Sequence, residues 1–303
     1  MTLTRRTILI GAAARLSAAA GKNAVGLSIG TYGMQSLPVD RAIQEIRDIG
    51  YDGAELCLMA GWPSEPSKLD AAARKRIRAT GFPIPSLIEN FNLLVSEEAH
   101  RATLERIRVA AALAHDVAPK SPPVLQSVLG GKPAEWAQVK GRMAERLADW
   151  ARVAAESEIL LTVKSHVSSA SDTPEKLIWL LDQVHSPALK GIYDYGHFHL
   201  LDIDLEESLD LLLPRSAFIT VKDGTRVNGA PRFLLPGQGT IDYQRYCAKL
   251  KAMHWSGWVL VEVSRQLQTV PGYDPIGAAR TSYAHLAPIL RDAGLRVSKE
   301  TTR

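Results

Sequence analysis

Short apolar runs alternate with amphipathic segments along almost the whole chain, and this alternation constrains the fold more than any other feature. We expect strands near residues 24–31, 53–58, 84–89, 123–129, 159–165, 190–195, 217–222 and 257–263. We expect helices near residues 38–49, 69–80, 97–115, 134–157, 173–184, 204–213, 242–253 and 275–293. An unbroken strand–helix alternation produces a parallel sheet, and about eight strands close a barrel. We therefore predict an α/β fold with a single (β/α)8 TIM barrel.

The alternation is not divided by a linker or a change in composition, so we predict one domain over residues 23–295 and a disordered tail at 296–303. The first strand is followed by Gly30-Thr31-Tyr32-Gly33 and not by G-x-G-x-x-G, which gives a dinucleotide-binding fold little support. The connection from Thr225 to Gly239 is long enough to be a functional loop over the barrel mouth.

Residues 1–22 have the composition of a targeting segment. Thr4-Arg5-Arg6-Thr7-Ile8-Leu9 resembles a twin-arginine signal, and Ser17-Ala18-Ala19-Ala20 suits a cleavage site. Arg15 interrupts the apolar stretch, so a basic disordered tail is the alternative. The first interpretation predicts an exported, periplasmic protein, and the second predicts a cytoplasmic one.

Charge and cysteine content exclude several classes of partner. The formal charge is +4, but residues 1–20 hold three arginines and no acid, so the rest of the chain is nearly neutral. There is no basic block interleaved with aromatic residues, which disfavours nucleic-acid binding. No run approaches the roughly 18 apolar residues of a membrane span. Cys57 and Cys247 give neither a disulfide framework nor zinc-ligand spacing. We expect a small-molecule partner, and homo-oligomerisation stays open.

Polar residues close several of the expected strands. In chain order these residues are Glu55, Glu89, Gln126, Lys164, Asp194, Thr220 and Glu262. A charge at the end of a buried strand is costly unless it faces a polar pocket. In a TIM barrel the carboxyl ends of the strands form the active-site mouth. The sequence therefore predicts an enzyme whose site includes Lys164, Asp194 and Glu262.

These residues lie within segments that resemble the sugar phosphate isomerase/epimerase superfamily, whose members have a xylose isomerase-like TIM barrel. The resemblance covers about residues 24–294. It rests on the order and strand-end placement of Gly50-Tyr51-Asp52-Gly53-Ala54-Glu55-Leu56, Asp194-Tyr195-Gly196-His197, Val221-Lys222-Asp223, Gly237-Gln238-Gly239-Thr240-Ile241-Asp242 and Gly257-Trp258-Val259-Leu260-Val261-Glu262.

The resemblance implies one divalent metal, such as Mn, Mg or Zn, held by Glu, Asp, His and Glu at the ends of strands five to eight. Asp194 and Glu262 match the second and fourth ligands, whereas Lys164 and Thr220 stand where Glu and His are expected. Two carboxylates alone make a poor site for a hard cation. We therefore expect no resident cofactor, with Asp194 and Glu262 as the only metal ligands if one binds. Our hypothesis is that the Lys164 ammonium takes the place of the metal.

The resemblance also suggests substrate contacts. His166 and His197 match substrate-contacting positions, although lone histidines are often structural. Arg226 lies where some relatives hold an arginine against the sugar. Glu55 could face the pocket or only buttress the barrel, and Glu89 is a weaker candidate of the same kind. A further candidate is Trp62, which could stack on a sugar face or pack against a helix.

Proton transfer beside a sugar carbonyl, as in isomerases and epimerases, is the function that the resemblance implies. Glu262 would act as the base, with Lys164 as the electrophile or second proton carrier. Three alternatives stay open. The same enolate could undergo β-elimination from a 3-keto-glycoside, Lys164 could form a Schiff base, or the barrel could bind a sugar without catalysis.

Overall fold

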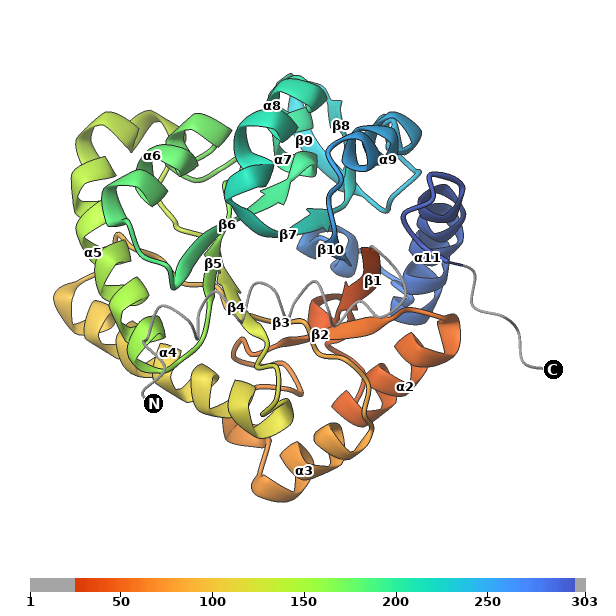
Figure 1. Ribbon diagram of the computed structural model, residues 1–303, viewed down its shortest axis with the longest axis horizontal. Helices are drawn as coiled ribbons and strands as arrows, with labels where there is room; N and C mark the ends of the chain where they lie inside the picture. The colour runs from red at the N-terminus through yellow and green to blue at the C-terminus, as the bar shows by residue number, and fades with distance from the viewer. Residues whose placement is uncertain (1–24, 298–303) are drawn as a thin grey trace.

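The computed structural model describes residues 25–297, which form a closed barrel of parallel strands in the order β1-β10-β7-β6-β5-β4-β3-β2. The barrel strands are β1 (Val25–Gly30), β2 (Gly53–Cys57), β3 (Ser86–Ile88), β4 (Val124–Ser127), β5 (Leu161–Val163), β6 (Leu189–Asp194), β7 (Ser216–Val221) and β10 (Gly257–Val261). Helices surround the barrel on the outside (Figure 1). The predicted (β/α)8 TIM barrel is confirmed.

Eight longer helices connect the strands: α2 (Val39–Ile49), α3 (Ala71–Ala79), α4 (Glu97–Val117), α5 (Trp136–Glu156), α6 (Pro174–Val184), α8 (Leu205–Leu212), α9 (Tyr243–Ala252) and α11 (Pro275–Asp292). Short helices α7 (Tyr195–His199) and α10 (Arg265–Gln268) follow strands β6 and β10. Single 3-10 turns occupy Thr31–Met34, Pro66–Lys68, Pro133–Glu135 and Leu213–Arg215.

Helix α2 illustrates how local sequence produces these elements. Ile43 and Ile46 are buried on one face, and each fully buried isoleucine contributes about 1.5–3 kcal/mol. Gly50 ends the helix with φ 114°, a left-handed conformation that glycine adopts without strain. The backbone turn at Gly50 then returns the chain to the barrel as strand β2.

The two ends of the described chain meet. The Val25 backbone N–H donates to the Leu295 carbonyl at 2.9 Å. Of the predicted tail, the structure describes residues 296 and 297; Arg296 is buried, and its guanidinium binds Asp52 at 2.9 Å and the Gly50 carbonyl at 3.0 Å. The predicted targeting segment or basic tail at residues 1–22 lies outside the described residues, so export stays a prediction. Among the described helices, none combines the length and apolar character that crossing a membrane requires.

The connection predicted as a loop contains a β-hairpin of strands β8 (Asp223–Val227) and β9 (Ala230–Leu234). Asn228 and Gly229 turn the hairpin with φ 51° and 78°, as two-residue hairpin turns require. Asp223 fixes the base of the hairpin, since its carboxylate accepts from the backbone N–H groups of Gly237 at 3.0 Å and Ile241 at 3.2 Å. These hydrogen bonds attach the base of the hairpin to the segment that precedes helix α9.

Candidate active site

Two lysines and two acids form a compact cluster at the carboxyl ends of β5, β6, β7 and β10, which we call the charge cluster: Lys164, Asp194, Lys222 and Glu262. The Lys164 ammonium lies 3.0 Å from Asp194 Oδ2 and 2.5 Å from Glu262 Oε2. The Lys222 ammonium lies 2.8 Å from Asp194 Oδ2 and 2.5 Å from Glu262 Oε1. Each lysine thus bridges both acids, and the structure brings the three predicted residues together with a fourth.

Burial and mutual charge set the protonation states in the charge cluster. Burial by itself raises the pKa of Glu262, but the ammonium groups of Lys164 and Lys222 outweigh it and lower that pKa to about 2. The same balance leaves the pKa of Asp194 below its usual value. Burial lowers the pKa of Lys164, but the two carboxylates outweigh it and raise that pKa above its usual value. All three groups are therefore charged near neutrality.

The local backbone allows Lys222 to reach the cluster. Lys222 follows β7 two residues after Thr220, which places both on the same face of the strand if the alternation continues. Gly196, just after β6, leaves the necessary room, because a Cβ there would lie 2.7 Å from Lys222 Cγ. Counting one polar residue per strand end singles out Thr220 and misses Lys222. Side chains two residues apart on a strand share a face, and applying this rule from Thr220 could have identified Lys222.

Several buried polar atoms beside the cluster have no hydrogen-bond partner among the described residues. They are Asp194 Oδ1, His197 Nε2 and Thr220 Oγ1. His197 Nε2 lies 3.5 Å from Asp194 Oδ2, but without hydrogen-bond geometry. An unpaired buried polar atom costs roughly 1–3 kcal/mol. This concentration of unpaired atoms is what a site built for ligand or water displays.

A cavity of about 270 Å³ opens beside the cluster. Its lining includes Lys164, Glu262, His166, Glu89 and Gln126, and it also contains Tyr32, Met59, Ile88, Asn90, Ser127, Val128, Ser168 and Ser169. Asp194 and Lys222 do not line the cavity. The charge cluster therefore has a cavity-facing half, Lys164 and Glu262, and a half that lies behind it.

His166 contributes a neutral side chain to the cavity wall. Burial and the ammonium charges of Lys222 and Lys164 lower the pKa of His166 to about 4. Its Nδ1 accepts from the backbone N–H of Ser168 at 3.2 Å, so Nε2 carries the proton. His166 can therefore donate a hydrogen bond to a ligand oxygen.

His197 and Phe233 lie against the rear half of the cluster. The His166 and His197 rings have centroids 4.1 Å apart, and the Phe233 ring centroid lies 5.1 Å from that of His197. The Lys222 ammonium lies 5.4 Å from the centre of the Phe233 ring. Strand β9 thus places an aromatic ring over Lys222, a contact that the sequence did not suggest. Burial keeps the pKa of His197 well below its usual value, so this histidine is neutral.

Glu55 lies inside the barrel and supports the cavity wall. Its Oε2 accepts from Ser86 Oγ at 2.7 Å and from the Gln126 amide nitrogen. Its Oε1 is buried without a partner among the described residues, as is Gln126 Oε1. Gly30 packs against this carboxylate, since a Cβ there would lie 2.9 Å from Glu55 Oε1. Glu55 therefore holds the side chain of Gln126, and Gln126 lines the cavity.

We expect the stability contribution of Glu55 to depend on pH. Burial raises the pKa of this carboxyl from 4.5 to about 7, although hydrogen bonds from Ser86 and Gln126 lower it. The fold favours the protonated acid, so the contribution is complete below pH 4.5 and is lost as the pH rises through 7. Glu55→Gln should therefore raise the melting temperature at pH 8 more than at pH 5. Equal shifts at both pH values would contradict this titration.

The remaining predicted contacts occupy different places. The Glu89 carboxylate lines the cavity and pairs with Arg106 at 2.6 Å. Trp62 stacks on Tyr32 with ring centroids 5.4 Å apart, so it backs a residue of the cavity wall. Arg226 does not line the cavity, because its guanidinium donates to the Leu200 carbonyl from an exposed position on the hairpin.

The fit of the site to a divalent metal is poor in this arrangement. Asp194, His197 and Glu262 offer ligand atoms within 4.8 Å of one another. However, both Glu262 oxygens and Asp194 Oδ2 already bind ammonium groups. A cation among these ligands would lie beside two positive charges, and like charges repel. The chemistry below is therefore derived from the side chains alone.

Removal of Lys222 should destabilise the fold strongly. Lys222→Met leaves Asp194 and Glu262 buried with one ammonium between them, and breaking a buried pair costs roughly 3–5 kcal/mol. Urea denaturation at pH 7 measures this loss as a fall in the free energy of unfolding. Lys249→Met is the matched control, because Lys249 pairs with the exposed Asp210 at 2.7 Å. Such a surface pair contributes about 1 kcal/mol or less. Equal losses in the two variants would contradict the buried bridge.

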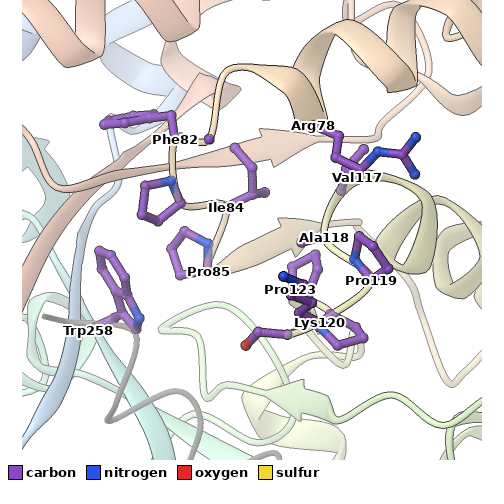
Figure 2. A pocket seen from close by; sticks show the side chains of 14 residues that line it. Arg78, Phe82, Ile84, Pro85, Val117, Ala118, Pro119, Lys120, Pro123 and Trp258 are labelled. Carbon is purple, nitrogen blue, oxygen red and sulfur yellow. The ribbon is translucent and has the colours of Figure 1, made fainter.

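A second cavity, of about 390 Å³, lies near the opposite end of the barrel. Figure 2 shows its mainly apolar walls, which include Phe82, Ile84, Pro85, Pro123 and Trp258. Its other lining residues precede strands β3 and β4, so it opens at their amino ends. None of the predicted site residues lines it. It is larger than the cavity at the charge cluster, and its lining includes Arg78 and Lys120 but no acid.

Comparison with known proteins finds partial sequence similarity to inosose dehydratases. The chain is 24% identical over 148 residues to an inosose dehydratase of Lactiplantibacillus plantarum, a match that covers 43% of this chain and 47% of that protein. The chain therefore spans about half the length of this curated relative.

Solved structures share the fold across most of the chain. One, described as the IOLI protein with a binding zinc atom, is 16% identical with a TM-score of 0.72 and covers 88% of this chain and 99% of that one. A D-tagatose 3-epimerase-like protein is 16% identical with a TM-score of 0.70 and covers 89% of this chain and 98% of that one. The profile of the xylose isomerase-like TIM barrel family matches residues 43–300. With the barrel, the strand-end residues and this match together, the chain belongs to the xylose isomerase-like TIM barrel family.

Proposed function

We propose that the protein removes a proton from the carbon beside a ketone of a sugar or cyclic polyol, and that the resulting enolate expels a β-substituent. The observation that carries this proposal is the direct contact between Glu262 and Lys164 on the wall of the cavity, at 2.5 Å. A carboxylate can accept the proton while the adjacent ammonium stabilises negative charge on the carbonyl oxygen. Sequence similarity to inosose dehydratases supports an elimination of this kind.

The steps balance without an added cofactor. The Glu262 carboxylate takes the α-proton, the electron pair of the C–H bond forms the carbon–carbon double bond of the enolate, and the π pair of the carbonyl moves onto its oxygen, to which Lys164 donates a hydrogen bond. The enolate then re-forms the carbonyl, a carbon–carbon double bond forms, and the β-hydroxyl or β-alkoxyl leaves. Protonated Glu262 returns its proton to that leaving group, which departs as water or an alcohol.

Ligand binding itself must activate Glu262, because a carboxyl whose pKa is about 2 is a weak base. When a carbonyl oxygen accepts the hydrogen bond of Lys164, Glu262 loses one of its two ammonium partners. The pKa of the carboxyl then rises toward its usual range, which strengthens the base. Lys222, on the far side of the cavity wall, keeps the carboxylate anchored throughout.

We favour elimination over epimerisation because a single acid on the cavity wall, Glu262, contacts Lys164. Epimerisation needs a second group that delivers a proton to the opposite face of the carbon. Lys164 contacts Glu262 directly, and its raised pKa makes it a poor proton donor. The raised pKa also disfavours a Schiff base, which requires a neutral amine. Epimerisation is a second candidate because Glu89 also lines the cavity, although Arg106 pairs with it.

A proton-exchange experiment tests the proposal. The protein is incubated with scyllo-inosose in D2O, and the reaction is followed by NMR and by absorbance of the conjugated enone. Elimination gives the enone with loss of water, whereas epimerisation gives deuterium at the α-carbon and a new stereoisomer. The same measurement with a 3-keto-glucoside extends the test to a glycosidic leaving group. If neither ketone exchanges its α-proton faster than in buffer, enolate formation is excluded and a sugar-binding barrel becomes the better description.

A further inference from the structure

We infer that the ligand of this cavity is an uncharged polyol ketone and carries neither phosphate nor carboxylate. This inference rests on the proposed function and specifies its substrate class. It follows from the partners of every cation near the cavity and from the hydrogen-bonding groups on the cavity wall.

Within the described part of the chain, the cavity wall presents one permanent cation, Lys164, and both acids of the charge cluster already hold it. Lys222 bridges the same two acids and does not line the cavity. Arg106 binds Glu89 at 2.6 Å and donates to the Leu58 carbonyl at 2.5 Å.

Two further arginines on the loops beyond the strand ends are also held outside the cavity lining. Arg226 donates to the Leu200 carbonyl and lies 3.8 Å from Asp202. Arg265 stacks on Trp62 at 5.4 Å and donates to Gln35 at 2.9 Å. Neither arginine lines the cavity. The residue that the sequence offered for an anionic group is therefore not positioned to bind one there.

The charges around the cavity cancel. The charge cluster has two positive and two negative groups, and Glu89 with Arg106 adds one of each. A phosphate or carboxylate would enter beside the exposed edge of Glu262 without a cation to compensate it. Burying an unpaired anion is strongly unfavourable, so the site discriminates against such ligands.

The remaining wall suits hydroxyl and carbonyl groups. His166 offers a neutral Nε2–H donor, as its Nδ1 is occupied by Ser168. Gln126 also lines the cavity, and its amide nitrogen is held by Glu55. Asn90 and Ser169 add further polar lining. A hydroxyl can hydrogen-bond with Asn90 or Ser169, and a carbonyl oxygen can accept from His166 or Lys164, so a neutral polyol ketone satisfies these groups.

Matched neutral and anionic ligands test this inference. Calorimetric titration of the full chain with myo-inositol and with inositol 1-phosphate compares the same ring with and without the anionic group. Glucose and glucuronate provide the corresponding carboxylate pair. We expect the neutral member of each pair to bind at least about tenfold tighter, a preference of about 1.4 kcal/mol. Equal or tighter binding of the anionic member would overturn the inference.

A variant can create the cation that the cavity lacks. Glu89→Gln removes the partner of Arg106 next to the cavity, so inositol 1-phosphate should bind at least about tenfold tighter than to the unaltered protein. The matched control is Asp182→Asn, which changes the net charge equally by freeing Arg215 from an exposed pair. No gain in Glu89→Gln, or the same gain in the control, would count against the inference.

Failure of this inference can be told apart from failure of the proposed function. An anionic ketone that exchanges its α-proton, when neutral ketones do not, would overturn the uncharged substrate and leave the enolate chemistry intact. Absence of exchange with both kinds of ketone would remove the proposed function, while the binding preference would still be measured with the non-reactive polyols.

Discussion

Glu262→Gln should remove most of the proton-transfer activity while the barrel stays folded. Glutamine keeps the size of the side chain but cannot accept the α-proton, and a positioned base contributes about 10²–10⁴-fold to rate. We therefore expect a loss of that size in the rate of α-proton exchange on a ketone substrate. The two ammonium groups would still hold Asp194, and circular dichroism with thermal melting checks that the fold persists.

Glu262→Asp separates the loss of charge from the loss of the base. Aspartate keeps the negative charge between Lys164 and Lys222 but withdraws the carboxylate by one methylene. Exchange should fall in this variant too, with a smaller change in melting temperature than in Glu262→Gln. A surface acid, Glu145→Gln, serves as the control and should leave exchange unaltered. Full activity in Glu262→Gln would eliminate Glu262 as the base.

Lys164→Glu combined with Thr220→His should convert the charge cluster into a divalent-metal site. Thr220 is paired in register with Asp194, and its buried hydroxyl has no partner among the described residues. The double variant exchanges an ammonium for a carboxylate and adds an imidazole, so Asp194 and Glu262 gain two metal-binding neighbours. One ammonium, that of Lys222, remains beside them in place of two. Metal affinity rises steeply with the number of charged ligands. We expect Mn²⁺ to bind the double variant at least about 100-fold tighter than the unaltered protein.

The single variants define what each substitution contributes to metal binding. Lys164→Glu alone should bind Mn²⁺ more weakly than the double variant, and Thr220→His alone should bind it weakly because Lys164 still repels the ion. Calorimetry and metal analysis after dialysis measure both. Tight, stoichiometric Mn²⁺ binding by the unaltered protein would contradict the idea that Lys164 takes the place of a metal ion.

The convergence of Lys164, Asp194 and Glu262 could be predicted because the carboxyl ends of barrel strands open on one rim. Once the alternation fixed the barrel, the last polar residue of each strand had to lie there. Lys222 was missed because attention to single strand ends overlooks the next residue on the same face. Lys222 joins the charge cluster because its side chain is long enough to reach Asp194 and Glu262. The spacing of residues along the chain does not reveal that reach.

Arg226 shows the opposite error, in which spacing suggested a contact that the fold does not make. It was placed by its distance from Thr220 along the chain, but Arg226 lies on strand β8 of the hairpin. Side chains of the hairpin alternate between its own two faces. A count of residues from the end of strand β7 therefore does not show whether the Arg226 side chain points toward the cavity. The cavity itself also depends on how loops from distant segments pack, and no local pattern in the sequence encodes that.

The hydrogen bond between Val25 and Leu295 brings together the first residue of strand β1 and a residue that follows helix α11. A covalent linker could therefore join these positions without stretching the intervening structure, and new chain ends could be opened at Asn228 and Gly229 on the exposed hairpin. Such a circular permutant would retain every strand neighbour of the barrel. It would also separate Lys222 from Glu262 between the two ends of the reordered polypeptide, so assembly of the cluster would report on closure of the whole barrel.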